Sequence, residues 1–146
     1  MKEIDDISKQ WATDSVIDEV MLASASAKIP VLHNKYYMMY VRETLRLKTL
    51  RAELTNLQRN KQEYFGGTMT MEKMKELNWK PYQLKHLKSD LGRIVEQDQD
   101  VIQLTLKIGY FETVVKYLED IIKQINNRNF IIKNMIDWNK FTSGSG

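Results

Sequence analysis

The chain has 146 residues, a net charge of +3 and no cysteine; 42% of its residues are hydrophobic and 28% are charged. This length fits one compact domain, or one small domain with an assembly element, and two prolines with six glycines predict a mostly helical protein. The composition excludes disulfides and thiolate sites, His33 and His86 have no metal-ligand spacing, and no apolar run approaches the roughly 20 residues that span a bilayer.

The first expected helix is "SVIDEVMLASASAK", because Asp14 or Ser15 can cap it and Pro30 should end it. A long second helix is expected from about Val31 to Phe65. Leucines recur in it at spacings of three and four, as in a coiled coil, at Leu47, Leu50, Leu54 and Leu57.

A glycine pair, Gly66-Gly67, should end the long helix, because glycine accepts the left-handed backbone of a helix end. Thr68 or Thr70 can then cap a short helix, "MEKMKELNW", and Pro81 marks a turn.

The last long helix has the clearest pattern of the chain. Its heptad positions are all apolar and comprise Val101, Leu104, Ile108, Phe111, Val115, Leu118, Ile122 and Ile125. A second apolar stripe comprises Tyr110, Val114, Tyr117 and Ile121. Two stripes on one helix imply contacts on two sides, so we expect at least one stripe to face a neighbouring subunit. Three asparagines interrupt the pattern before a final amphipathic helix, "RNFIIKNMIDWNKF".

A basic stripe lies between residues 35 and 61, where seven basic and two acidic residues give +5 while the rest of the chain carries −2. Such a stripe is typical of polyanion binding, and the alternative is a solvated helix face. Single-stranded nucleic acid requires cations for phosphates and flat side chains for bases. Arg59 and Lys61 have no apolar role in the helix and are the best candidates, whereas packing is favoured over base stacking for Tyr64 and Phe65.

A second basic segment, "NWKPYQLKHLK", adds further candidate phosphate contacts at Lys80, Lys85 and Lys88. Trp79 and Tyr82 lie between these lysines, and packing is again the favoured interpretation of both rings.

Catalytic patterns are missing from the sequence, which has neither a phosphate-binding loop nor a nucleophile elbow. The acid pairs Asp98/Asp100 and Glu119/Asp120 are interpreted as solvated flanks of the heptad helix rather than as acid–base catalysts. We therefore expect a binding protein without cofactor or metal, and an enzyme is the least supported class.

Three segments, "SVIDEVML", "LQRNKQEYFGG" and "NNRNFIIKNMIDWNKF", resemble in order and spacing the UvsY family of T4-type phage recombination mediators, over nearly the whole chain. The resemblance implies a helical subunit that forms a hexameric or heptameric ring through its C-terminal helices. It also implies binding of single-stranded DNA without sequence preference and no ATPase activity. Such a protein helps a phage RecA-like recombinase displace the single-stranded-DNA-binding protein, in recombination-dependent replication and repair in the cytoplasm of the infected bacterial host.

The basic-x-basic pattern of the family falls on Arg59 and Lys61. Asn60 and Gln62 surround this pair and more basic residues precede it, so the DNA surface is expected to extend to Arg51, Arg46 and Arg42.

We therefore expect an all-α subunit with a DNA-binding region at residues 1–94, an oligomerisation region at 95–141 and a flexible tail at 142–146. Two hypotheses compete with a recombination mediator. The first is a structural coiled-coil adaptor that does not bind DNA directly, and the second is a small enzyme that acts on DNA.

Overall fold

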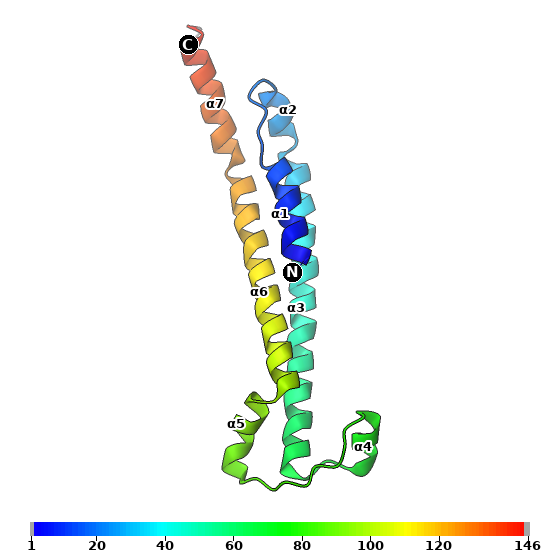
Figure 1. Ribbon diagram of the computed structural model, residues 1–146. Coiled ribbons are helices and arrows are strands. Elements are labelled where there is room, and N and C mark those ends of the chain that lie inside the picture. The colour runs from blue at the N-terminus through cyan, green and yellow to red at the C-terminus, as the bar shows by residue number, and fades with distance from the viewer. Residues whose placement is uncertain (1, 145–146) are drawn as a thin grey trace. The chain divides into compact units, whose positions relative to one another are not determined.

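The computed structural model describes residues 2–144, and every regular element within them is helical (Figure 1). The α-helices are α1 (Lys2–Asp14), α2 (Leu22–Ala27), α3 (Ile29–Gly66), α4 (Met71–Glu76), α5 (Leu91–Glu96), α6 (Gln99–Asn126) and α7 (Arg128–Thr142). A short 3-10 helix, η1 (Lys88–Asp90), precedes α5. The predicted all-α class is confirmed, and assembly into a ring stays a prediction.

The chain divides into two compact units. Unit 1 comprises Met1–Leu45 with Glu112–Gly146, and unit 2 comprises Arg46–Phe111. The predicted boundary between residues 94 and 95 falls inside α5, and the functional regions assigned to its two sides stay predictions. In the predicted tail, Thr142 ends α7 and residues 143–144 form a turn, while residues 145–146 lie outside the described residues.

The N-terminal helices differ from the prediction. Residues 2–14 already form α1, and residues 15–21 form an irregular connection where a helix was expected. In that connection the backbone N–H of Val20 donates to the Asp18 side chain at 3.0 Å, a local bond that competes with helix formation. Pro30 lies in the first turn of α3, where its missing N–H costs no helical hydrogen bond. It therefore begins the long helix rather than ending the previous one.

The end of α3 agrees with the prediction. Gly67 adopts a left-handed φ of 79°, and the N–H of Thr68 donates to the carbonyl oxygen of Glu63 at 3.0 Å. Thr70 then caps α4, since its side chain accepts a hydrogen bond from the backbone N–H of Lys73.

The core of unit 1 is built mainly from α1, the first part of α3 and the last part of α6. Tyr36 is fully buried, its ring meets the Trp11 ring edge-on at 5.3 Å, and its hydroxyl donates to the Asp14 carboxylate at 2.8 Å. The α6 side chains of this core, all no more than 1% exposed, are Val114, Leu118, Ile121 and Ile125.

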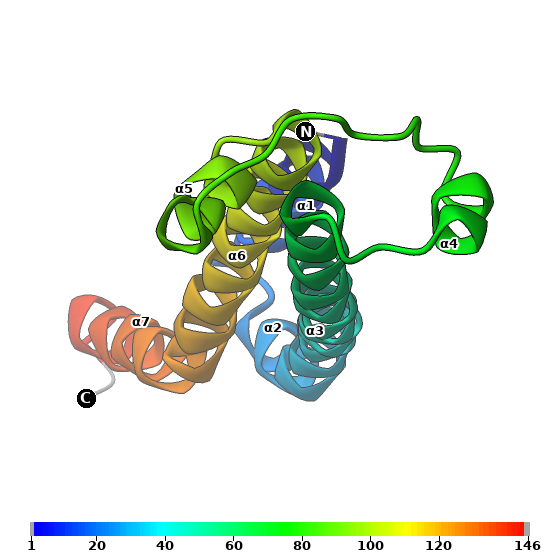
Figure 2. The ribbon, with the colours of Figure 1, turned by 90° about the horizontal axis from the view of Figure 1, so that it is seen from below.

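In unit 2, α3 and α6 run antiparallel, because Arg46 lies over the Phe111 ring while Lys61, further along α3, meets Asp100 near the start of α6. The helices α4 and α5 lie on opposite sides of the C-terminal end of α3 (Figures 1 and 2). The buried hydrophobic side chains of this unit are Leu47, Leu50, Met69, Met74, Leu91, Val95, Val101, Ile108 and Phe111.

The α6 heptads fill the interior of the single chain more completely than expected. Five of the eight predicted oligomerisation residues are buried, namely Val101, Ile108, Phe111, Leu118 and Ile125. Leu104, Val115 and Ile122 are half-buried. The second stripe also contributes buried Val114 and Ile121, so neither stripe is left whole for a neighbouring subunit. None of the helices among residues 2–144 combines the length and apolar character that a membrane span requires.

Candidate nucleic-acid interface

Lys61 lies one turn before the end of α3, and its side chain is buried. Only 6% of the residue is exposed, and its Nζ atom lies 2.9 Å from Asp100 Oδ2 and 3.2 Å from Asp98 Oδ1. The ammonium group also lies over the Trp79 ring, 4.4 Å from its centroid. The prediction that Lys61 faces outward beside Arg59 is therefore wrong, because this face of α3 meets the N-terminal end of α6.

The ion pairs keep Lys61 charged despite its burial. Burial would lower the pKa of Lys61, but hydrogen bonds to Asp100 and Asp98 outweigh it and raise the pKa above its ordinary value of 10.5. The other carboxylate oxygen of Asp98 accepts from the N–H groups of Asp100 and Val101, so Asp98 also caps α6. Its side chain is only 13% exposed, and the interpretation of Asp98 as a solvated acid is wrong.

Arg59 lies on the exposed surface of α3, as predicted. Its guanidinium group donates to Asn56 Oδ1 at 2.8 Å, and within residues 2–144 it has no ion pair with an acid. Arg59 and Lys88 line one groove of about 280 Å³ at the end of α3. The other lining residues are Gln62, Glu63, Gly66, Thr68, His86 and Leu91.

Two cations dominate this groove, which we call the Arg59 groove. Its one lining carboxylate, Glu63, is already paired with Lys73 at 2.9 Å. An anion in the groove would therefore meet Arg59 and Lys88 with little opposing charge. Sequence reasoning missed His86, whose position between Lys85 and Lys88 was the available signal.

An aromatic cluster lies beside this end of α3 and comprises Tyr64, Phe65, Trp79, Tyr82 and His86. The Tyr64 ring lies 5.1 Å from Trp79 and 5.3 Å from Tyr82, and Phe65 lies 5.0 Å from Tyr82. The Tyr64 hydroxyl donates to the carbonyl oxygen of Lys80, and Tyr82 is hydrogen-bonded to His86. All five side chains are half-buried, so the rings pack together and still reach the surface.

A left-handed residue directs Trp79 into the aromatic cluster. Asn78 follows α4 with a φ of 58°, and the N–H of Trp79 donates to the carbonyl oxygen of Met74 at 2.8 Å. Asparagine tolerates this backbone better than most residues. The chain therefore reverses after α4 and brings Trp79 back onto Tyr64.

The remaining predicted cations are exposed and lie along α3 or in the segment between α4 and α5; they are Arg42, Arg46, Arg51, Lys80 and Lys85. Arg42 belongs to unit 1, and the other seven predicted DNA-binding residues belong to unit 2. Unit 2 holds 12 basic and 8 acidic residues, a net charge of +4, whereas unit 1 holds 10 basic and 11 acidic residues, a net charge of −1. The positive charge is thus concentrated in the unit that carries the Arg59 groove.

These features define an all-α protein with a positively charged helical unit, in which a cationic groove lies near clustered aromatic rings. A family model described as "Recombination, repair and ssDNA binding protein UvsY" matches residues 10–145. The chain belongs to this family, and the resemblance drawn from the sequence is confirmed. No curated protein matches the chain in sequence.

The fold is similar to that of the bacteriophage T4 recombination mediator protein UvsY in several crystal lattices. For lattice type II the TM-score is 0.78 at 17% identity, with 95% of this chain and 96% of that chain covered. For lattice type IV the TM-score is 0.78 at 17% identity, with coverages of 94% and 97%. For lattice type I the TM-score is 0.77 at 18% identity, with coverages of 94% and 98%. At this identity the likeness shows the fold alone.

Proposed function

We propose that this protein is a recombination mediator that binds single-stranded DNA through the exposed cations of unit 2. In this role it promotes loading of a RecA-like recombinase by displacing the single-stranded-DNA-binding protein, in the cytoplasm of an infected bacterial host. The family description and the fold support this proposal. The observation that carries it is the convergence of Arg59 and Lys88 on one groove beside the aromatic cluster. The protein acts by binding, without a catalytic step.

DNA binding requires different contributions from the two members of the basic-x-basic pair. Arg59 is exposed and can contact a phosphate directly, with the release of counterions. Lys61 contacts Asp98, Asp100 and the Trp79 ring, so it supports the end of α3 and the aromatic cluster from inside. Lys61 is thus a positioning residue for the DNA surface, in contrast to its predicted role as a direct contact.

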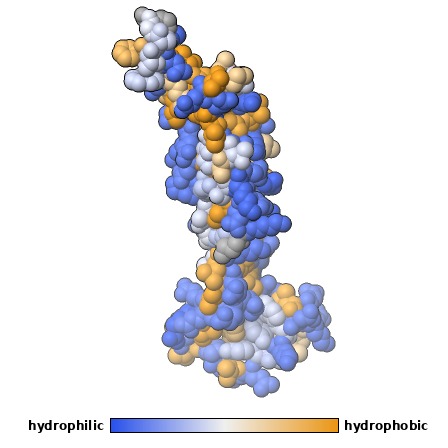
Figure 3. All heavy atoms as spheres, turned by 45° about the horizontal axis from the view of Figure 1, so that its top comes forward, coloured by the Kyte–Doolittle hydropathy of each residue, from blue (hydrophilic) through white to orange (hydrophobic). Residues whose placement is uncertain are grey.

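Self-assembly has a candidate surface on α7. Phe130, Trp138 and Phe141 are 69%, 64% and 75% exposed and lie near one face of the helix, with the last two rings stacked at 5.9 Å. Figure 3 shows hydrophobic surface gathered near α7 and α2 on the face that is drawn. Exposed apolar patches of this kind are typical of protein–protein contacts. We propose that this α7 face joins neighbouring subunits in a ring, so that several modest DNA sites act together.

The test is a fluorescence anisotropy titration of a labelled oligo(dT) strand at low and moderate salt. The double variant Arg59→Glu, Lys88→Glu should bind at least about tenfold more weakly, with a shallower salt dependence, since each lost phosphate contact lowers the slope by about 0.7. Lys75→Glu, Lys107→Glu is the matched control, because it also reverses two exposed charges of unit 2 outside the Arg59 groove.

Two results would count against the proposal. Equal weakening by Arg59→Glu, Lys88→Glu and by Lys75→Glu, Lys107→Glu would remove the Arg59 groove from the DNA site. A wild-type protein without salt-sensitive binding would favour the coiled-coil adaptor.

A further inference from the structure

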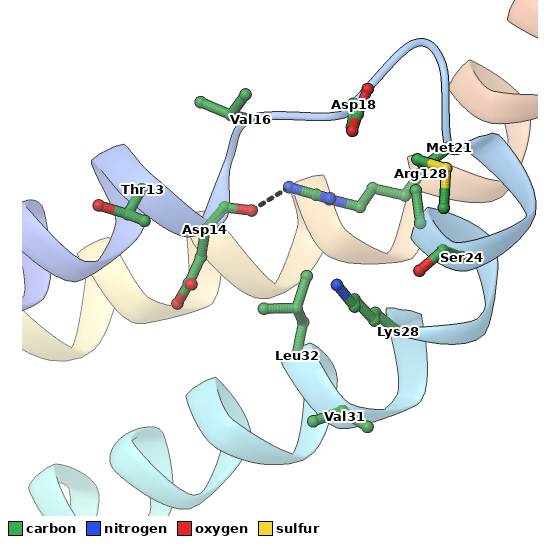
Figure 4. Close-up of a pocket in the computed structure, with 11 residues that line it drawn as sticks. Thr13, Asp14, Val16, Asp18, Met21, Ser24, Lys28, Val31, Leu32 and Arg128 are labelled. Atoms are coloured by element: carbon green, nitrogen blue, oxygen red, sulfur yellow. Dashed lines mark hydrogen bonds between the residues drawn. The ribbon is translucent and has the colours of Figure 1, made fainter.

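Unit 1 contains a pocket of about 640 Å³ that none of the predicted DNA-binding residues lines (Figure 4). It is bounded by the end of α1, the connection at residues 15–21, α2, the start of α3 and the first residue of α7. Its volume lies within the range of about 300–1,000 Å³ that ligand pockets occupy. We call it the Arg128 pocket, because a buried arginine forms part of its wall.

Arg128 is only 5% exposed, and its charge is incompletely compensated. Its guanidinium group donates to the backbone carbonyl oxygen of Asp14 and lies over the Trp11 ring at 5.7 Å. The Asp14 carboxylate accepts hydrogen bonds from Lys35 and Tyr36 instead, and Figure 4 shows it directed away from Arg128. Among the described residues no carboxylate is paired with Arg128, although an arginine offers five N–H donors. Consistently, burial lowers the pKa of Arg128, although the charges of Asp14 and Tyr36 act in the opposite direction.

A second cation faces the same space. Figure 4 shows the Lys28 side chain directed into the pocket, and no described acid is paired with it. The one other acid of the lining, Asp18, accepts the N–H of Val20 within its own connection. Two cations therefore meet one exposed carboxylate, so the pocket favours an anionic group.

The rim of the pocket is apolar and open to solvent. Val16, Met21 and Val31 line it and are 71%, 55% and 69% exposed, and the neighbouring Val20 is 88% exposed. Isolated exposed apolar residues are common, but a group of them around a charged pocket is typical of a docking surface. The site thus suits a ligand that combines an acid with aliphatic side chains.

We propose that the Arg128 pocket binds an acidic, apolar peptide segment of a protein partner. A carboxylate of the segment pairs with Arg128 and Lys28, because a planar carboxylate matches the arginine fork and satisfies its remaining donors. Aliphatic side chains of the segment cover Val16, Met21 and Val31 and remove them from water. This inference goes beyond the proposed DNA-binding role, since it assigns a partner site to unit 1.

The lining argues against two other occupants. Single-stranded DNA requires stacking platforms for its bases, and none of the described lining residues is aromatic. A second copy of α7 carries three basic residues and one acid, so its charge does not complement the pocket. Charge complementarity therefore favours an acidic partner segment.

The test uses the full-length protein and a fluorescein-labelled ten-residue peptide with alternating aspartate and leucine. A peptide with asparagine in place of every aspartate is the chemical control. Anisotropy should show saturable binding of the aspartate peptide and binding about tenfold weaker, or undetectable, for the asparagine peptide.

Variants at the rim locate the binding without disturbing the buried Arg128. Lys28→Glu and Val31→Asp should each weaken the aspartate peptide by about tenfold, because each places a new acid beside the bound carboxylate. Lys9→Glu, an exposed charge reversal on α1 outside the pocket, should leave binding unchanged. Oligo(dT) affinity should be the same for all three variants.

Three outcomes would overturn the proposal. The first is equal affinity for the two peptides, and the second is equal weakening by Lys28→Glu and Lys9→Glu. The third is loss of oligo(dT) binding in Lys28→Glu, which would assign the pocket to the DNA surface. A failure of oligo(dT) binding in the wild-type protein would contradict the proposed function, but it would not affect the conclusion from the peptide experiment.

Discussion

The ammonium group of Lys61 lies 2.9 Å from the carboxylate of Asp100, so one cation of the basic stripe is held inside the protein. Asp98 completes the arrangement at 3.2 Å. Arg59 is therefore an exposed candidate contact for DNA, whereas Lys61 is buried and supports the fold. Substitutions of the two residues should have different effects.

Replacement of Lys61 should lower the stability of the fold, whereas replacement of Arg59 should not. Lys61→Met should reduce the free energy of unfolding by about 3 kcal/mol, because it leaves the largely buried carboxylate of Asp98 without its cation. Arg59→Met, at an exposed position, should change stability by no more than about 0.5 kcal/mol. Urea denaturation followed by circular dichroism measures both values. Equal stability of the two variants would contradict the buried role of Lys61.

The salt dependence of DNA binding should respond to Arg59 and not to Lys61, the reverse of the effect on stability. Under conditions where both variants are folded, Arg59→Met should reduce the salt slope of oligo(dT) binding by about 0.7 per subunit. Lys61→Met should retain the wild-type slope, since its side chain does not reach a phosphate. If only Lys61→Met reduced the salt slope of oligo(dT) binding, Lys61 would have to break its ion pairs with Asp98 and Asp100 and contact DNA directly.

Assembly and folding should respond to different aromatic residues. Phe111 is 4% exposed, so Phe111→Asp buries a charge and should abolish cooperative thermal unfolding. Trp138 is 64% exposed, so Trp138→Asp should keep the helical spectrum and lower the molar mass in sedimentation. A folded but dissociated Phe111→Asp protein would instead place the α6 heptads between subunits.

Acid should weaken unit 1 through Asp14. Burial would raise the pKa of Asp14, but hydrogen bonds from Lys35 and Tyr36 outweigh it, and the net pKa lies below the ordinary value of 3.8. A carboxyl group whose pKa is lowered by folding stabilises the protein above pH 3.8, and this contribution disappears as the pH falls through the folded pKa.

The corresponding variant is Asp14→Asn. It should be less stable than wild type by about 1–3 kcal/mol near neutral pH, because the Lys35 and Tyr36 donors lose their charged acceptor. The difference in unfolding free energy should shrink below pH 3.8. Asp5→Asn, at an exposed position of α1, should match wild type throughout. A difference that does not depend on pH would contradict the role of the carboxylate.

The turn after α4 gives a backbone prediction. Asn78→Gly should be close to neutral, whereas Asn78→Val should cost about 1–2 kcal/mol, since a β-branched residue resists the left-handed φ of 58°. Tryptophan fluorescence during denaturation is a suitable probe, because Trp79 follows this residue. Equal stability of the two variants would contradict the role assigned to the turn.

Features with local causes were predictable from the sequence. The long helix, the Gly67 stop and the Thr70 cap each depend on residues within a few positions of one another. The α1 helix was not predicted, although Ile4, Ile7 and Trp11 recur at the helical spacings of three and four residues.

Features that depend on distant partners were not predictable in the same way. Burial of Lys61 requires the start of α6 to lie against α3, and periodicity along α3 contains no information about that neighbour. Four of the five rings of the aromatic cluster were noted in the sequence, all except His86, but the Arg59 groove needs residues from the end of α3 and from the segment at 86–91.

Asp98 performs two tasks, since one of its oxygens caps α6 and the other pairs with Lys61. In a family member with a neutral residue at position 61, the residue at position 98 would still cap α6 but would have no cation to pair with. Asparagine at position 98 would then be sufficient, because it also caps helices. Positions 61, 98 and 100 should therefore covary among homologues, with acids at 98 and 100 where position 61 is basic. The pattern of substitutions across the family would thus record a tertiary contact between two helices.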